Sequence, residues 1–185
     1  MTPTNLETLK AAIARGEAFT FRPFFGHTPR ADGALSDACF SQWWRCRFEA
    51  EGVRYVTAEQ YMMAAKARLF HDEATLAQIL AEEDPSKVKA LGRQVKGFVD
   101  TQWAAARFDA VTAGSIAKFS SSPELKAYLL STGESVLVEA APRDRIWGIG
   151  LGRDNPFVSE PARWRGQNLL GFALVRARAA LRSSA

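Results

Sequence analysis

The stretch "TAEQYMMAAKARLF", residues 57–70, has the composition and the starting signal of a helix. Thr57 is a good N-cap, and Gln60 three residues later completes a capping box. Ala, Met and Leu then favour helix. Glu59 and Lys66 are seven residues apart, so they share one face of this helix, about 10 Å apart along its axis. An acid and an amine therefore bracket a stripe that is otherwise apolar, and helix formation requires neither of them.

Further helices are expected on both sides of this stretch, from caps and apolar periodicity. Asp84 with Pro85 starts one of them, since proline suits the first helical position. Ser122 starts another, and Gly133 ends it. The expected helices are a short one around Leu6, Leu9 and Ile13, and those at 72–83, 84–95, 101–120, 122–133 and 166–181.

Few strands are expected. The segments "RCRF" and "VRYV" alternate around a Glu-Ala-Glu-Gly turn, which is typical of a hairpin. The sequence "EAFTFRPFFG" at 17–26 has the pattern of a strand, "SVLVEAA" at 135–141 that of a buried strand, and "RIWGIGLGRDNPF" at 145–157 that of a short strand before a loop. The sequence thus predicts a mostly helical α+β domain over residues 1–185, with a small antiparallel or mixed sheet.

Composition narrows the class of protein. The chain has 185 residues, of which 47% are hydrophobic, as expected for one globular domain. No apolar run approaches 18 residues, and the first residues lack a secretory signal, so we expect a cytoplasmic protein without a membrane contact. The cysteines, Cys39 and Cys46, and the histidines, His27 and His71, lack the spacing of a zinc site. No metal or cofactor is expected, and the oligomeric state stays open.

The charge is positive, with a net charge of +4 and a pI near 9.3. Arginine accounts for 17 of the 24 basic residues, and its guanidinium suits bidentate phosphate recognition. This composition favours a phosphate-bearing partner such as a nucleotide or nucleic acid. A general preference of the host for arginine is the favoured explanation, because the basic residues are scattered and make no patch that is visible in the sequence.

A second distinctive stretch is "RIWGIGLGRDNPFVSEPARWRGQNLLG", residues 145–171. Its glycines at 148, 150 and 152 permit positive φ and close approach of the backbone to a ligand. Trp147 offers a stacking surface, and residues 166–168 are expected to open the last helix, whose N-terminus favours anions. The combination suits a base or a sugar phosphate, although a strained turn packed by tryptophans would carry the same residues.

Several motifs together resemble one family. "SQWW", "TAEQYMMAAKA", "ALGRQV", "IWGIGL" and "RGQNLLGFAL" occur in the order and approximate spacing of the NADAR family, also called YbiA-like, over residues 20–180. The resemblance implies an α+β fold and an N-glycosidase that acts on ribosylated compounds. One branch of the family resembles hydrolases of phosphoribosylamino-pyrimidine intermediates of riboflavin synthesis, and another removes ADP-ribose from guanine bases of nucleic acid.

The resemblance also implies roles for individual residues. Glu59 and Lys66 match the acid and the amine of the family's central helix, and Asp154 is a further catalytic candidate. The positions that match the substrate-binding motifs are Gln42, Trp43, Arg93, Trp103, Trp147, Gly148, Gly150 and Asn168.

Two departures from the family pattern affect the choice of branch. Phe25 stands where the family often has tryptophan in Phe-Trp-Gly-His. Ile149 follows Trp147-Gly148, where the riboflavin-type branch often has aspartate. Asp154, which lies downstream, is a candidate to take the place of that aspartate. These departures favour the hydrolase of ADP-ribosyl-guanine, with the riboflavin intermediate as the alternative and a reader that binds ADP-ribose or a nucleotide without turnover as a third possibility.

The chemistry of N-glycoside cleavage fits the pair on the helix. The reaction needs protonation of the leaving group and a nucleophile at the anomeric carbon. Glu59 is the expected acid and base. Lys66 is either an anchor for phosphate or sugar, or a nucleophile that captures the opened ribose as a Schiff base.

Overall fold

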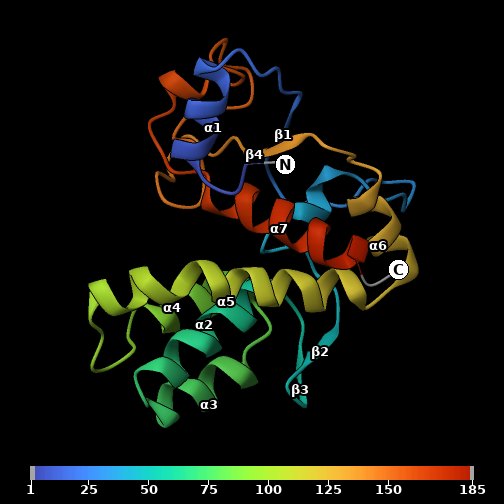
Figure 1. Ribbon diagram of the computed structural model, residues 1–185. Coiled ribbons are helices and arrows are strands. Elements are labelled where there is room, and N and C mark those ends of the chain that lie inside the picture. The colour runs from blue at the N-terminus through green and yellow to red at the C-terminus, as the bar shows by residue number, and fades with distance from the viewer. Residues whose placement is uncertain (1–2, 184–185) are drawn as a thin grey trace.

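The computed structural model describes residues 3–183, and it confirms a mostly helical α+β fold (Figure 1). The expected domain ends, residues 1–2 and 184–185, lie outside the described residues. The helices are α1 (Leu6–Ala14), α2 (Ala58–Leu69), α3 (Glu73–Ala81), α4 (Pro85–Gly92), α5 (Asp100–Ser120), α6 (Pro123–Leu130) and α7 (Leu169–Ser183), with short 3-10 helices η1 (Asp37–Phe40) and η2 (Pro161–Arg163).

The start of α2 forms as its sequence predicts. The Thr57 hydroxyl accepts a hydrogen bond from the Gln60 backbone N–H at 3.1 Å. The Gln60 side chain accepts from the N–H of Val56 and donates to carbonyls at the end of α3, including that of Ile79. This glutamine therefore joins α2 to α3 as well as closing the helix start.

The strands form two separate pairs. β2 (Phe48–Ala50) and β3 (Val53–Tyr55) make the expected antiparallel hairpin. β1 (Phe21–Phe24) and β4 (Val136–Glu139) pair in parallel, with Phe24 opposite Glu139. Because parallel strands end at the same edge, the segments that follow β1 and β4 meet there. This pairing sets the position of one wall of the site.

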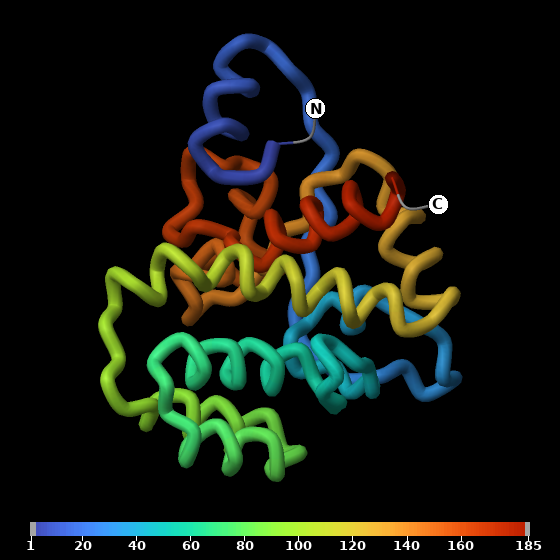
Figure 2. The backbone as a smooth tube through the Cα atoms, turned by 60° about the horizontal axis from the view of Figure 1, so that its bottom comes forward, coloured from blue at the N-terminus to red at the C-terminus, as the bar shows by residue number. Residues whose placement is uncertain are grey.

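The long helix α5 lies at the centre of the molecule. It packs against α7 on one side and against α2 on the other, and α3 and α4 pack against α2 (Figures 1 and 2). The larger hydrophobic cluster joins these helices, and a smaller one lies between α1, β4, α7 and the loop that follows β4. The smaller cluster consists of Leu9, Val136, Val138, Ile149, Leu151, Trp164 and Phe172.

Two expectations about the segment after β4 are wrong. Residues 145–157 form turns and no strand, and α7 begins at Leu169 rather than at 166. Asn168 has a φ of +55°, which lies outside the range of a right-handed helix, so the helix begins after this residue. A Cβ on Gly166 would lie 2.2 Å from the Gly148 carbonyl oxygen, so glycine is needed where the loop folds back on itself. Contacts distant in sequence, rather than local propensity, determine this segment.

Candidate functional site

Glu59 lies in the first turn of α2 with only 3% of its surface exposed. Its backbone N–H donates to the Gln42 carbonyl at 2.9 Å, which ties α2 to the segment before β2. Its Oε1 has no hydrogen-bond partner among the residues that the structure describes. A buried carboxylate oxygen without a partner is costly, so a ligand group is the natural partner for this atom.

The surroundings of Glu59 set its protonation state. Burial raises the pKa of its carboxyl from an ordinary 4.5 to about 7. The positive charges of Lys89 and Arg93, in and just after α4, and a hydrogen bond from the Trp43 side chain oppose this rise, while the charge of Asp144 adds to it. A carboxyl that titrates near neutrality suits acid–base catalysis at that pH.

Glu139, the last residue of β4, supplies a second carboxyl group. Burial raises its pKa to about 8, and the charges of Asp144 and Glu59 add to the rise. The two carboxyl groups are coupled, because an ionised Glu59 raises the pKa of Glu139 and the reverse holds for the same pair of charges. The Oε2 atom of Glu139 is enclosed and has no partner within residues 3–183. Both carboxyl groups therefore have a raised pKa, and as a pair they can retain a proton near neutral pH.

Asn168 fixes the strand that carries Glu139. It is fully buried, its Oδ1 accepts from the Glu139 backbone N–H, and its Nδ2 donates to the Leu137 carbonyl, both at 2.9 Å. With both ends of the amide used in this way, its side chain supports the backbone of β4. Its predicted role in binding substrate stays a prediction.

Asp144 organises the loop after β4. Its Oδ1 accepts from the backbone N–H groups of Ile146 and Trp147, at 2.9 and 2.8 Å. Its carbonyl accepts from the N–H of Gly150, which has a φ of +67°. Trp147 packs against the larger hydrophobic cluster, to which the buried Trp103 belongs. The aspartate therefore holds the Trp-Gly turn and places a negative charge near both glutamates.

Asp144→Asn is expected to move the pH profile of activity to lower pH. Removing this charge lowers the pKa of Glu59 and of Glu139, while the Asn oxygen still accepts from Ile146 and Trp147. The measurement is kcat/KM between pH 5 and 9, whose acidic limb should move downward. Glu160→Gln, which removes an exposed acid of the same loop, is the matched control. A profile that stays in place in Asp144→Asn would show that this charge does not reach the working groups.

A pocket of about 390 Å³ opens beside Trp43. The imidazole of His27 lies 5.4 Å from the Trp43 ring, and the Lys89 amine lies 5.8 Å from it. The wall consists of His27, Thr28, Pro29, Trp43, Arg45, Asp84, Pro85 and Ser86. Trp43 thus both hydrogen-bonds the Glu59 carboxyl group and lines this pocket.

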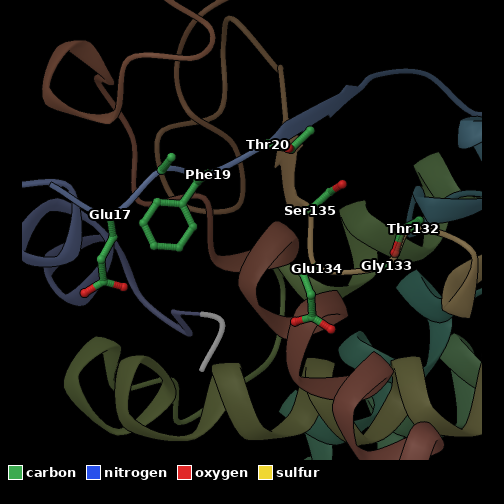
Figure 3. A pocket seen from close by; sticks show the side chains of 8 residues that line it. Glu17, Phe19, Thr20, Thr132, Gly133, Glu134 and Ser135 are labelled. Carbon is green, nitrogen blue, oxygen red and sulfur yellow. The ribbon is translucent and has the colours of Figure 1, made fainter.

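A larger pocket, about 430 Å³, lies elsewhere (Figure 3). It is formed by residues 17–20, before β1, and residues 132–135, between α6 and β4. None of the predicted site residues lines it. Size alone is therefore a poor guide to the site in this molecule.

Lys66 lies toward the other end of α2. Its amine donates to the Gly92 carbonyl at 2.7 Å and lies 4.1 Å from the centre of the Phe98 ring. Burial lowers its pKa, and the charge of Asp100 opposes that effect. The lowered pKa is what a nucleophilic amine needs, but the amine must leave Gly92 to react.

Comparison with known proteins gives the family of the chain. Residues 24–182 match the NADAR domain. The chain belongs to the NADAR family. N-glycosidase R617 of Acanthamoeba polyphaga mimivirus is 44% identical over 144 residues, which are 75% of this chain and 85% of that protein. N-glycosidase YbiA of Escherichia coli is 28% identical over 139 residues, 75% of this chain and 78% of YbiA. These relatives confirm the expected enzyme class, hydrolases of N-glycosyl bonds.

The NADAR fold is also seen in a solved structure. The NMR structure of Escherichia coli YbiA has a TM-score of 0.69 at 22% identity, covering 98% of this chain and 94% of that one. At this identity the likeness concerns the fold alone. None of the described helices is long and apolar enough to cross a membrane, and residues 3–183 contain no group of three His, Cys, Asp or Glu placed to hold a metal ion.

The structure brings together some of the residues predicted for the NADAR site. Gln42, Trp43 and Arg93 lie around Glu59. Asp154, by contrast, is exposed on the loop after β4, and none of the contacts among the described residues joins it to Glu59. Its catalytic role stays a prediction without geometric support.

Three residues that lie around Glu59, namely Glu139, Asp144 and Lys89, were not predicted from the sequence. Glu139 ends a buried apolar strand, and an acid in that position is itself a signal, because charged residues are seldom buried. Asp144 lies two residues before Ile146, which is the spacing of an Asx turn, and this spacing can be seen in the sequence. Lys89 carries no local signal, since a lysine in an amphipathic helix is commonplace.

Proposed function

We propose that this NADAR N-glycosidase removes ADP-ribose from guanine bases of nucleic acid. The observation that carries the proposal is the pair of enclosed carboxyl groups, Glu59 and Glu139, beside the cations Lys89 and Arg93. Each carboxyl group has an oxygen without a partner among residues 3–183. Carboxyl groups of this kind suit transfer of a proton to a leaving base. The adjacent cations suit a phosphate.

The carboxyl pair supplies what bond cleavage requires. A carboxyl group whose pKa burial raises, such as Glu139, can donate to the leaving nitrogen or its ring system. Ionised Glu59 can stabilise positive charge that develops at the anomeric carbon, or take a proton from the attacking group. Because the two pKa values belong to the coupled pair, the carboxyl groups can also exchange these roles.

Position 149 supports the choice of branch. Ile149 is fully buried in the smaller hydrophobic cluster, so this position offers the site no carboxylate of the kind that the riboflavin-type branch often has there. The arginine-rich composition also agrees with a nucleic-acid substrate. Trp43, beside the open pocket, has the surface on which a base can stack.

One observation keeps the riboflavin intermediate as the second candidate. Asp144 supplies a carboxylate from the same loop, three residues before Trp147, and its charge acts on both glutamates. If Asp144 takes the role of the aspartate that position 149 lacks, a phosphoribosylamino-pyrimidine is the expected substrate.

A direct assay decides between these substrates. The enzyme is incubated with an oligonucleotide that carries ADP-ribosylated guanine, and separately with the phosphoribosylamino-pyrimidine, and released sugar is measured by chromatography. We expect release of ADP-ribose from the oligonucleotide, at a rate well above that on the pyrimidine. The reverse preference would assign the riboflavin branch. Tight binding of ADP-ribose without release from either substrate would indicate a reader.

A further inference from the structure

Lys118 is a buried cation that the proposed reaction does not use. It lies in α5 with 1% of its surface exposed, and burial lowers the pKa of its amine to about 8. The nearby thiols of Cys46 and Cys39 oppose that effect. No carboxylate forms an ion pair with it anywhere in residues 3–183. Lysines are rarely buried without a partner of opposite charge, so the contact it does make needs an explanation.

That contact is with the main chain of the segment before Trp43. The Lys118 amine donates to the Ser41 carbonyl at 2.8 Å, and the same oxygen accepts from the Trp44 N–H at 3.2 Å. The Ser41 hydroxyl accepts from the Trp43 N–H at 3.1 Å. Ser41 is therefore held through its carbonyl and through its side chain.

The segment that starts at Ser41 leads directly to the candidate acid. The Gln42 carbonyl accepts from the Glu59 N–H at 2.9 Å, and the Trp43 side chain hydrogen-bonds the Glu59 carboxyl group. An unbroken series of contacts thus runs from the amine of Lys118 through Ser41 and Trp43 to Glu59.

We propose that Lys118 is a positioning residue that acts through Ser41 to hold the Trp43 side chain against the Glu59 carboxyl group. The amine can do this where a methionine of similar length cannot, because only the amine donates to the Ser41 carbonyl. The consequence for catalysis rests on the proposed function, in which Glu59 acts on the substrate. The positioning of Trp43 by Lys118 does not depend on the proposed function.

The test compares substitutions at Lys118 with removal of the tryptophan contact. Lys118→Met removes the donor, and Lys118→Gln keeps an uncharged one. Trp43→Phe removes the hydrogen bond to Glu59 directly. Lys10→Met, in which an exposed lysine of α1 is replaced, is the control for loss of one positive charge. Thermal unfolding identifies the variants that fold, and Lys118→Gln carries the test if Lys118→Met does not fold.

The decisive measurement is the pKa of Glu59 in the absence of substrate. It is obtained by carbon-13 NMR of the side-chain carboxyl groups, in which the Glu59 signal is assigned by its loss in Glu59→Gln. Lys89 and Arg93 on the α4 side, Glu139 at the end of β4 and Asp144 beyond it also act on this carboxyl, as does Trp43. The variants change only the Trp43 contribution. Since that hydrogen bond lowers the pKa of Glu59, Lys118→Met should raise it, as Trp43→Phe does. Lys118→Gln should raise the pKa of Glu59 less than Lys118→Met does, and Lys10→Met should leave that pKa unchanged.

Activity gives a second readout. In Lys118→Met we expect kcat to fall about 10-fold with a smaller change in KM, since small displacements of catalytic groups cost rate. The double variant with Trp43→Phe should be no worse than Trp43→Phe alone. A folded Lys118→Met with an unchanged Glu59 titration, or effects that add in the double variant, would overturn the proposal. A shifted titration in a protein that cleaves neither substrate would overturn the proposed function and leave the positioning role intact.

Discussion

Glu59→Gln is expected to lower turnover by about 10²-fold or more, the scale of lost general acid–base catalysis. The amide has the size of the carboxyl but cannot exchange a proton at neutral pH. The measurement is kcat on whichever ribosylated substrate the enzyme cleaves, with Glu49→Gln, an exposed acid of β2, as the control. Activity close to that of the unmodified enzyme would reduce Glu59 to a partner of the helix dipole.

The same substitution should stabilise the protein above neutral pH. Because the pKa of Glu59 is raised in the folded state, the unfolded chain ionises first, and folding stability falls as the pH rises from about 4.5 to about 7. Above that window the unmodified protein carries the full cost, on the order of 3 kcal/mol. Urea unfolding should therefore show Glu59→Gln more stable at pH 8 and similar at pH 4. Equal stability at both values would mean that the buried carboxyl ionises freely.

The second large effect concerns Lys66. Borohydride added during turnover is expected to attach the sugar to this lysine, because it reduces an imine to a stable amine, and mass spectrometry should locate the adduct on the peptide that contains residue 66. Lys66→Arg should abolish the adduct and lower turnover by about 10²-fold or more, because a guanidinium stays protonated and cannot attack. Lys89→Arg is the matched control: it keeps a cation in the site and should leave the adduct in place.

The structure adds a condition to this prediction. The Lys66 amine donates to Gly92 and lies over Phe98, so it must turn away from both to reach an opened ribose. An active enzyme that yields no adduct, together with an active Lys66→Arg, would leave Lys66 as a structural lysine or an anchor. Water activated by one of the carboxyl groups would then be the nucleophile.

Local sequence was sufficient for most of the helices and for the place of Glu59 in the first turn of α2. Caps such as Thr57, Asp84 and Ser122 lie where the structure has them, because an N-cap acts within three residues of itself. The hairpin was also predictable from local sequence, because adjacent residues make its turn: Glu51 and Gly52 both have positive φ.

The segment after β4 was not predictable in this way. Its shape depends on Asn168 reaching back to β4 and on Gly166 passing close to Gly148. Such contacts have no local signal. Glu139 does carry a signal, as an acid that ends a buried apolar strand, but its raised pKa depends on Glu59 and Asp144, whose positions beside it the local sequence does not give.

The parallel pairing of β1 with β4 has a consequence for the order in which the molecule becomes active. Phe24 and Glu139 are paired across more than a hundred residues. Pairings of such long sequence separation form slowly, because a long loop must close before the contact is made. During synthesis, β1 leaves the ribosome long before its partner strand exists. Glu139 then reaches Glu59 only when nearly all of the helical layers are available, so catalytic competence should appear as one of the last events of folding.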